Sequence, residues 1–194
     1  SGAQEADFQG ARIYTSAAGT YDVHGAILSK YLASGGPQTR GLPTTDETTV
    51  PGGNAAGRMN AFTGANIYWS PWTGAHILYG DILAKYLAIG AGAYGLPVTD
   101  VYSIPGVSGA EEADLQYARI YNSSTTGVHE VHGAILSKYL VSGGPQAFGL
   151  PKTDEIVVPG ISSARMNDFE RAQVYWSPGT GARIVYGAIL TKYK

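Results

Sequence analysis

The sequence Gly25-Ala26-Ile27-Leu28-Ser29-Lys30-Tyr31-Leu32 returns in closely related form from Gly80, Gly133 and Gly187. A second segment, Ala11-Arg12-Ile13-Tyr14, recurs from Ala65, Ala118 and Ala172 at spacings of 54, 53 and 54 residues. A fixed period of this length is typical of proteins built from tandem structural repeats. The sequence therefore predicts one repeat domain over residues 1–194, with units at approximately 1–54, 55–107, 108–161 and 162–194.

A longer period of two repeats lies over the first. Repeats one and three share Ser34-Gly35-Gly36-Pro37-Gln38, which returns from Ser142, whereas repeats two and four share Arg58-Met59-Asn60, which returns from Arg165. The order A-B-A-B predicts a pseudo-twofold relation. Because the first repeat begins with a strand segment and the last ends with a helix, we expect complementary end faces and closure into a ring.

Each repeat combines β and α patterns. In the first repeat, residues 11–16 and roughly 20–24 are β-type runs around a Gly-containing loop, a pattern typical of a hairpin. Ile27, Leu28 and Tyr31 share one face at helical spacing, and Gly35-Gly36-Pro37 predicts the end of a short helix. A helix of two to three turns is marginal alone, so it must pack on its neighbours. The predicted fold class is α+β.

Short connectors join the repeats. Gly41-Leu42-Pro43 returns at Gly95 and Gly149, and this composition predicts a rigid turn. Four tyrosines recur in every repeat and are expected in a shared core: Tyr14, Tyr68, Tyr121 and Tyr175.

Composition excludes several classes of protein. The chain of 194 residues has 44% hydrophobic residues, which exceeds the content of disordered chains, yet no apolar run approaches the roughly 18 residues of a membrane span. The formal charge is −2 and the basic residues are scattered, so no basic stripe is present to bind a phosphate backbone. We therefore do not expect nucleic acid as a partner. The absence of cysteine excludes thiolate metal sites, and we expect no metal or cofactor.

The connectors Arg40-Gly41-Leu42-Pro43-Thr44-Thr45-Asp46-Glu47 and residues 148–155, together with Ile67-Tyr68-Trp69-Ser70 and Gly74-Ala75-His76, resemble the LGFP-repeat family. The resemblance covers nearly the whole chain. It implies a secreted or envelope-associated protein, a compact ring of repeats and an association with cell-wall polysaccharide. Members often accompany mycolyltransferases, amidases or esterases of actinobacteria. Here the family's Leu-Gly-aromatic-Pro becomes residue-Gly-Leu-Pro, and Trp follows the Ile-Tyr or Val-Tyr pair only in repeats two and four.

The tryptophans are the first candidates for ligand contact. Trp69 and Trp176 occupy equivalent places in the B repeats, each followed by Ser-Pro, and Trp72 occurs once. An aromatic ring at the end of a strand can offer a flat apolar face to a sugar, or it can pack between repeats. Because only the B repeats carry these residues, we expect two strong sites related by the pseudo-twofold.

Polar candidates lie near the hairpin turns and in the connectors. His76 and Arg183 align just beyond the same turn of the two B repeats, and we expect each to join the tryptophan of its repeat. Asp46, Asp100 and Asp154 close the connectors and could accept hydrogen bonds from sugar hydroxyls. The alternative is a turn or cap bond to the local backbone.

No catalytic motif is present, neither a nucleophile elbow nor a zinc-protease helix nor a phosphate loop. We therefore expect a non-catalytic, lectin-like carbohydrate-binding protein with several shallow sites at repeat boundaries. One alternative is a structural or protein-interaction module without glycan affinity, and another is a hydrolase that uses Glu47 or Glu155. The sugar and the oligomeric state stay open.

Overall fold

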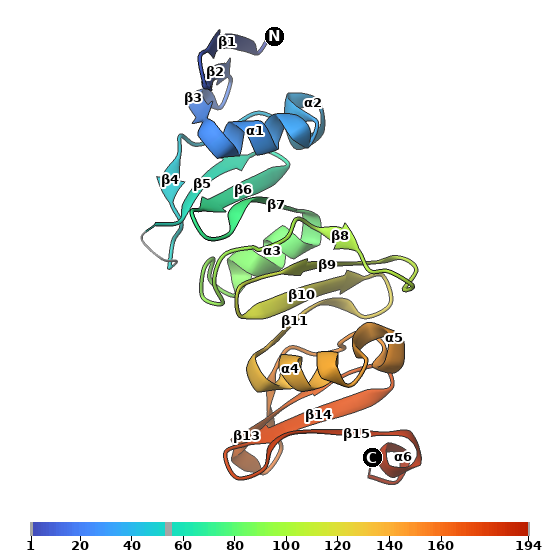
Figure 1. Ribbon diagram of the computed structural model, residues 1–194. Coiled ribbons are helices and arrows are strands. Elements are labelled where there is room, and N and C mark those ends of the chain that lie inside the picture. Colours follow the sequence, from blue (N-terminus) through green and yellow to red (C-terminus); the bar gives the residue numbers. More distant parts are fainter. Residues whose placement is uncertain (1, 53–55, 194) are drawn as a thin grey trace. The chain divides into compact units, whose positions relative to one another are not determined.

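Each of the four repeats folds into a small antiparallel sheet followed by a short helix (Figure 1). The computed structural model describes residues 2–52 and 56–193, so the expected boundary between residues 54 and 55 lies outside the described residues. The chain divides into two compact units, Ser1–Val101 and Tyr102–Lys194, and each unit holds two repeats.

In every repeat the strands precede the helix, and among the described residues a second short helix follows in repeats one and three. The first repeat has β1 (Gln4–Phe8), β2 (Ala11–Ser16), β3 (Gly19–His24), α1 (Gly25–Ala33) and α2 (Gly36–Arg40). The second has β4 (Thr48–Thr49), β5 (Arg58–Phe62), β6 (Ala65–Ser70), β7 (Gly74–Tyr79) and α3 (Gly80–Ala88). The third has β8 (Tyr102–Ser103), β9 (Ala110–Asp114), β10 (Ala118–Ser123), β11 (Gly127–His132), α4 (Gly133–Val141) and α5 (Gly144–Phe148). The fourth has β12 (Ile156–Val158), β13 (Ile161–Asp168), β14 (Ala172–Ser177), β15 (Gly181–Tyr186) and α6 (Gly187–Tyr193).

The sheets are simple meanders. Their strand orders are β1-β2-β3, β4-β5-β6-β7, β8-β9-β10-β11 and β12-β13-β14-β15, and all neighbours are antiparallel. The predicted hairpin and helix of the first repeat are confirmed as β2, β3 and α1. The sequence reading missed the strand that precedes each hairpin and the short strand that follows each connector.

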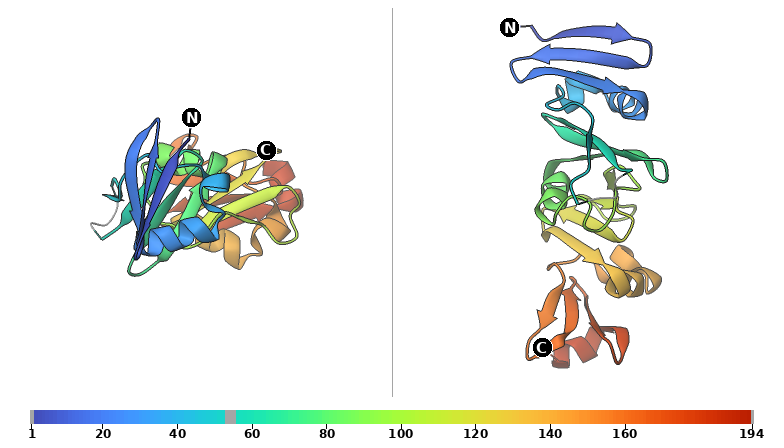
Figure 2. Two further views of the ribbon diagram at one scale, coloured as in Figure 1. Left: turned by 90° about the horizontal axis from the view of Figure 1, so that it is seen from above. Right: turned by 90° about the vertical axis from the view of Figure 1, so that its left-hand side faces the viewer.

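The first helix of each unit lies between two sheets. In the right-hand view of Figure 2, β1–β3 lie on one side of α1 and the strands of the next sheet on the other. Tyr31 of α1 stacks on Phe62 with a centroid distance of 4.3 Å, and Tyr139 of α4 stacks on Phe169 at 4.2 Å. Each helix is thus stabilised by its own sheet and by the sheet of the following repeat. Ring closure depends on how the two units meet and stays a prediction.

The connectors are held by the helices before them. Gly41 has a φ of 74°, and a Cβ atom there would lie 1.7 Å from the Thr63 Oγ1 atom, so only glycine fits. The Tyr31 hydroxyl donates to the Gly41 carbonyl at 2.5 Å, and the Tyr139 hydroxyl donates to the Gly149 carbonyl at 2.6 Å. These contacts hold the connectors at Gly41 and Gly149 against the preceding helices, and their rigidity stays a prediction.

The recurrent strand tyrosines belong mostly to the core. Tyr14, Tyr68 and Tyr121 are buried, as expected, whereas Tyr175 is half-buried. Tyr175 packs against a small cluster of Val158, Ala164 and Met166, which is separate from the main core of the unit. Among the described residues, no helix has the length and apolarity needed to cross a membrane.

Candidate functional site

The connector aspartates bind the backbone of the hairpin that precedes them. The Oδ1 atom of each accepts a hydrogen bond from a strand N–H: Asp46 from Asp22 at 3.0 Å, Asp100 from Ile77 at 3.1 Å and Asp154 from Glu130 at 3.1 Å. The aspartates therefore do bind backbone groups, as the alternative interpretation expected. The bonds span 23 or 24 residues, however, and are not local turn or cap bonds. A role of these aspartates in sugar binding stays a prediction.

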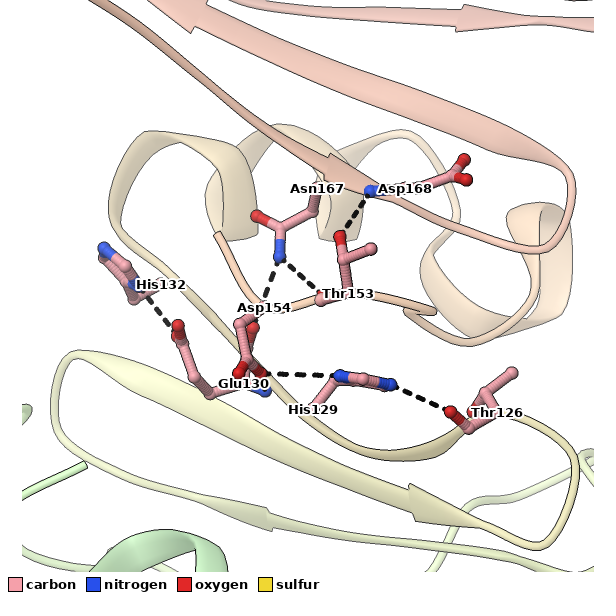
Figure 3. Close-up of polar contacts among 8 residues, drawn as sticks. All are labelled: Thr126, His129, Glu130, His132, Thr153, Asp154, Asn167 and Asp168. Atoms are coloured by element: carbon pink, nitrogen blue, oxygen red, sulfur yellow. Dashed lines mark hydrogen bonds and ion pairs between the residues drawn. The ribbon is translucent and has the colours of Figure 1, made fainter. Parts of the chain in front are cut away.

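A buried asparagine extends this arrangement to the next sheet. The Asn167 side-chain amide donates to the Glu130 carbonyl at 3.3 Å and to the Thr153 carbonyl at 3.0 Å (Figure 3). The Thr153 hydroxyl in turn accepts from the Asp168 N–H at 3.0 Å. Asn60 makes the same pair of bonds in the first unit. These bonds connect the two sheets of each unit.

A hollow of about 500 Å³ lies at the boundary between the repeats of the second unit. Its walls come from the end of β11, the beginning of α4, the connector and the sheet of repeat four. The lining includes His132, Glu155, Arg165, Trp176 and Pro178. Four of these side chains, His132, Glu155, Arg165 and Trp176, are called the quartet below.

Charged groups of alternating sign line this hollow. The His132 Nδ1 atom lies 2.7 Å from Glu130 Oε2, and its Nε2 atom lies 3.4 Å from Glu155 Oε2. The Arg165 Nε atom lies 3.7 Å from Glu155 Oε1. The hydrogen bond to Glu130 raises the pKa of His132, because it favours the charged imidazolium. Burial raises the pKa of Glu155, although His132 and Arg165 oppose that effect.

The first unit repeats the same set of side chains. His24 Nε2 lies 3.7 Å from Glu47 Oε2, and Arg58 Nε lies 3.7 Å from Glu47 Oε1. Trp69 is half-buried against the core, as Trp176 is in the second unit. Between repeats two and three, the sequence instead has Tyr79, Val101, Glu111 and Asn122 at these four places. The quartet is therefore a feature of the A-to-B junction, and it occurs once in each unit.

The structure does not bring His76 and Arg183 to the tryptophans. Directly opposed residues of antiparallel strands share a face, and neighbours along a strand point to opposite faces. Trp69 pairs with Ala75 while His76 pairs with Tyr68, and Arg183 pairs with Tyr175. His76 and Arg183 thus lie on the other face of their sheets from Trp69 and Trp176.

His76 has its own bonding pattern. Its Nε2 atom lies 2.7 Å from the Thr73 carbonyl oxygen and its Nδ1 atom 3.4 Å from Asp100 Oδ1. Arg183 and Trp72 are exposed to solvent. Among the described residues, no group of three or more His, Asp or Glu side chains could hold a metal ion.

The sequence analysis identified the two tryptophans as candidates but did not assign His132, Glu155 or Arg165 to their site. The sequence does contain a signal for these residues. His24 and His132 occupy equivalent places in the two A repeats, and Arg58 and Arg165 occupy equivalent places in the two B repeats. Glutamate follows the connector aspartate only at the two A-to-B junctions, at Glu47 and Glu155. Residues confined to one repeat type would have indicated a site between the types.

Comparison with known families agrees with the repeat organisation. The model of the LGFP repeat matches residues 1–38, 41–93, 95–146 and 148–194. Together these matches cover nearly the whole chain. No curated protein matches the sequence.

Proposed function

Because this chain belongs to the LGFP repeat family, we propose that it is a non-catalytic carbohydrate-binding protein with one glycan site in each compact unit. The observation that carries the proposal is the hollow of about 500 Å³ lined by the quartet in the second unit, together with the return of the same four residue types in the first unit. Hollows of a few hundred Å³ that combine an apolar wall with a few polar groups are typical small-ligand sites.

The chemistry of the quartet suits a sugar. The indole face of Trp176 can cover the C–H face of a pyranose ring, which removes apolar surface from water. Glu155 can accept and Arg165 can donate hydrogen bonds to ring hydroxyls, and such charge-assisted bonds are stronger than neutral ones. Since Glu130, His132, Glu155 and Arg165 carry charges of both signs, the site favours a neutral sugar over a strongly charged one.

We further propose that the natural ligand is a cell-wall polysaccharide and that the protein is secreted or associated with the cell envelope. Both proposals rest on the family to which the chain belongs. A long polymer presents many copies of one epitope, so two weak sites on one chain gain apparent affinity without new contacts.

Calorimetric titration with neutral oligosaccharides, chosen from a glycan array, tests the proposal. The wild-type chain should bind two ligands, and Trp176→Ala should weaken one site by roughly 1–3 kcal/mol. Tyr117→Ala is the control, because Tyr117 is an exposed aromatic residue outside both quartets, and it should leave both sites unchanged. If Trp176→Ala lowers the melting temperature, Arg165→Met serves as a second variant. It keeps most of the aliphatic bulk of the side chain, removes the hydrogen-bond donors and should weaken binding at the same site.

Absence of binding to every glycan on the array would contradict the proposal. Release of reducing ends from a bound polysaccharide, lost in Glu155→Gln, would replace it with hydrolysis. The second candidate, a protein-interaction module, is favoured by one specific observation, the exposed apolar side chains Phe8 and Ile189.

A further inference from the structure

The hairpin tips of the two B repeats have the same hydrogen bonds but differ in one residue. Residues 70–74 read Ser-Pro-Trp-Thr-Gly, and residues 177–181 read Ser-Pro-Gly-Thr-Gly. In each tip the serine Oγ atom accepts from the threonine N–H, at 3.1 Å in the first unit and 3.3 Å in the second, and lies 2.8 Å from the threonine Oγ1 atom. Trp72 and Gly179 therefore occupy equivalent places on the same turn.

In the second unit this tip forms part of the wall of the quartet hollow. Pro178, which directly precedes Gly179, lines the hollow together with Trp176. A Cβ atom at Gly179 would have no atom within 4 Å beyond its chain neighbours, so the space beside this wall is open. A ligand that extends out of the hollow past Pro178 therefore meets no side chain at residue 179.

The first unit has a tryptophan at that place. Trp72 directly follows Pro71, the equivalent of Pro178, and lies three residues after Trp69 of the first quartet. Trp72 is 67% exposed, whereas Trp69 is half-buried against the core. The indole of Trp72 thus contributes little to the packing of the unit, and it offers an apolar face beside a candidate ligand site.

The other repeats show that the turn itself does not require tryptophan. The equivalent residue is Thr125 in repeat three, and the shorter tip of repeat one has two alanines at residues 17–18. The Ser123 hydroxyl accepts from the Thr126 N–H at 3.1 Å, so the same turn forms with threonine in that place. Local folding therefore gives no reason for an indole at residue 72, whereas its position next to a quartet gives one based on binding.

We propose that Trp72 forms an additional sugar-binding subsite, which extends the quartet site of the first unit along the glycan chain. The inference rests on the proposed function. Trp69 covers one sugar ring, and Trp72 covers a further ring of the same chain by removing its C–H face from water. The first unit should therefore prefer longer neutral oligosaccharides, and the second unit should gain less from added length.

Calorimetric titration with a disaccharide and a tetrasaccharide of one neutral sugar, chosen from the glycan array, tests this proposal. Trp176→Ala leaves the site of the first unit, and Trp69→Ala leaves that of the second. The gain in affinity from disaccharide to tetrasaccharide should be about 3- to 10-fold larger in Trp176→Ala than in Trp69→Ala, the size expected of one aromatic contact. If either variant lowers the melting temperature, Arg165→Met or Arg58→Met replaces it.

Exchange of the tip residue supplies the sharpest comparison. Trp72→Gly, made in the Trp176→Ala chain, should remove the additional gain. Gly179→Trp, made in the Trp69→Ala chain, should confer it on the second unit, because the φ of Gly179 lies outside the left-handed region and a Cβ atom there meets open space. Thr125→Trp is the matched control, since it places an indole on the tip of repeat three, whose sequence lacks the quartet tryptophan, and it should confer no gain. Circular dichroism melting checks that each exchange preserves the fold.

The outcomes separate this inference from the proposed function. Absence of binding of both sugars to both single-site chains would overturn the proposed function and the subsite together. If both sugars bind but the gain with length is the same in the two units, or persists in Trp72→Gly, the subsite is wrong while the quartet sites remain. Equal weakening of both sugars in Trp72→Gly would place Trp72 inside the quartet site, and would also overturn the extension.

Discussion

Asp100 joins three parts of the first unit through one carboxylate. Burial raises its pKa, but hydrogen bonds from His76, Lys30 and the Ile77 N–H more than offset that effect and lower the pKa of Asp100 to about 2. A carboxyl group with a lowered folded-state pKa stabilises the protein above its unfolded pKa, which is near 3.8, and loses that contribution as pH falls toward 2.

We therefore expect Asp100→Asn to lower the free energy of unfolding at pH 7 by about 1 kcal/mol, a figure reduced for solvent screening because the side chain is 39% exposed. The difference between the wild type and the variant should shrink between pH 4 and pH 2. Urea unfolding at a series of pH values measures it. A difference that is constant over this range would show that the ionised carboxylate is not its cause.

The pKa of His132 can also be tested by a single substitution. Its hydrogen bond with Glu130 raises its pKa, so the imidazolium persists to higher pH than in an unfolded chain. Glu130→Gln keeps the shape of the side chain and removes the charge, and it should lower the midpoint of the His132 titration followed by NMR. His129 provides an internal control, because its described partners are Thr126 and Asp154. An unchanged His132 midpoint would contradict the assigned pairing.

Among the elements, the helix tyrosines connect α1 and α4 to the connectors that follow them. Tyr139 is fully buried, and its hydroxyl donates to the Gly149 carbonyl at 2.6 Å. Tyr139→Phe leaves that carbonyl without its donor, at a cost of about 1–3 kcal/mol in the free energy of unfolding. Tyr117→Phe, at an exposed position, is the matched control and should have little effect. Chemical denaturation of both variants measures the difference, and equal stabilities would show that the bond contributes little.

The helices and strands also show what the sequence could and could not predict. The hairpin and helix were predictable because their apolar positions follow local periods, from residues 11–16 through Leu32. In the first repeat the preceding strand was missed because all five residues of β1 are exposed, so burial imposes no alternation of apolar residues on this segment. The short helix α2 was missed because Gly36-Pro37 was interpreted as a helix stop, whereas proline is also favoured in a first helical turn.

The candidate site was only partly predictable for a different physical reason. His132 lies 23 residues before Glu155, and Glu155 lies 10 residues before Arg165. The three side chains meet through the packing of α4 between two sheets. A local periodic pattern in the sequence does not predict contacts between such distant residues. The sequence did identify Trp69 and Trp176 through the A-B pattern, but the choice of His76 and Arg183 as their neighbours ignored the alternation of faces along a strand.

At the scale of the whole molecule, each compact unit contains one complete A-to-B junction and therefore one quartet. Loss of one quartet should thus change the binding of a polymer and of a short oligosaccharide in different ways. With Trp176→Ala, a short ligand should retain its affinity for the quartet of Trp69, while the number of strong sites falls from two to one. Binding to a long polysaccharide should weaken by about 100-fold or more, because the intramolecular second contact is lost.

Trp69→Ala should have the same effect through the other unit, and the double variant should bind neither ligand strongly. Titration with the oligosaccharide and surface binding to the polymer supply the two measurements, with Tyr117→Ala as the common control. If both ligands weaken equally in the single variants, the two quartets do not act as independent sites on one polymer, and the bivalent model fails.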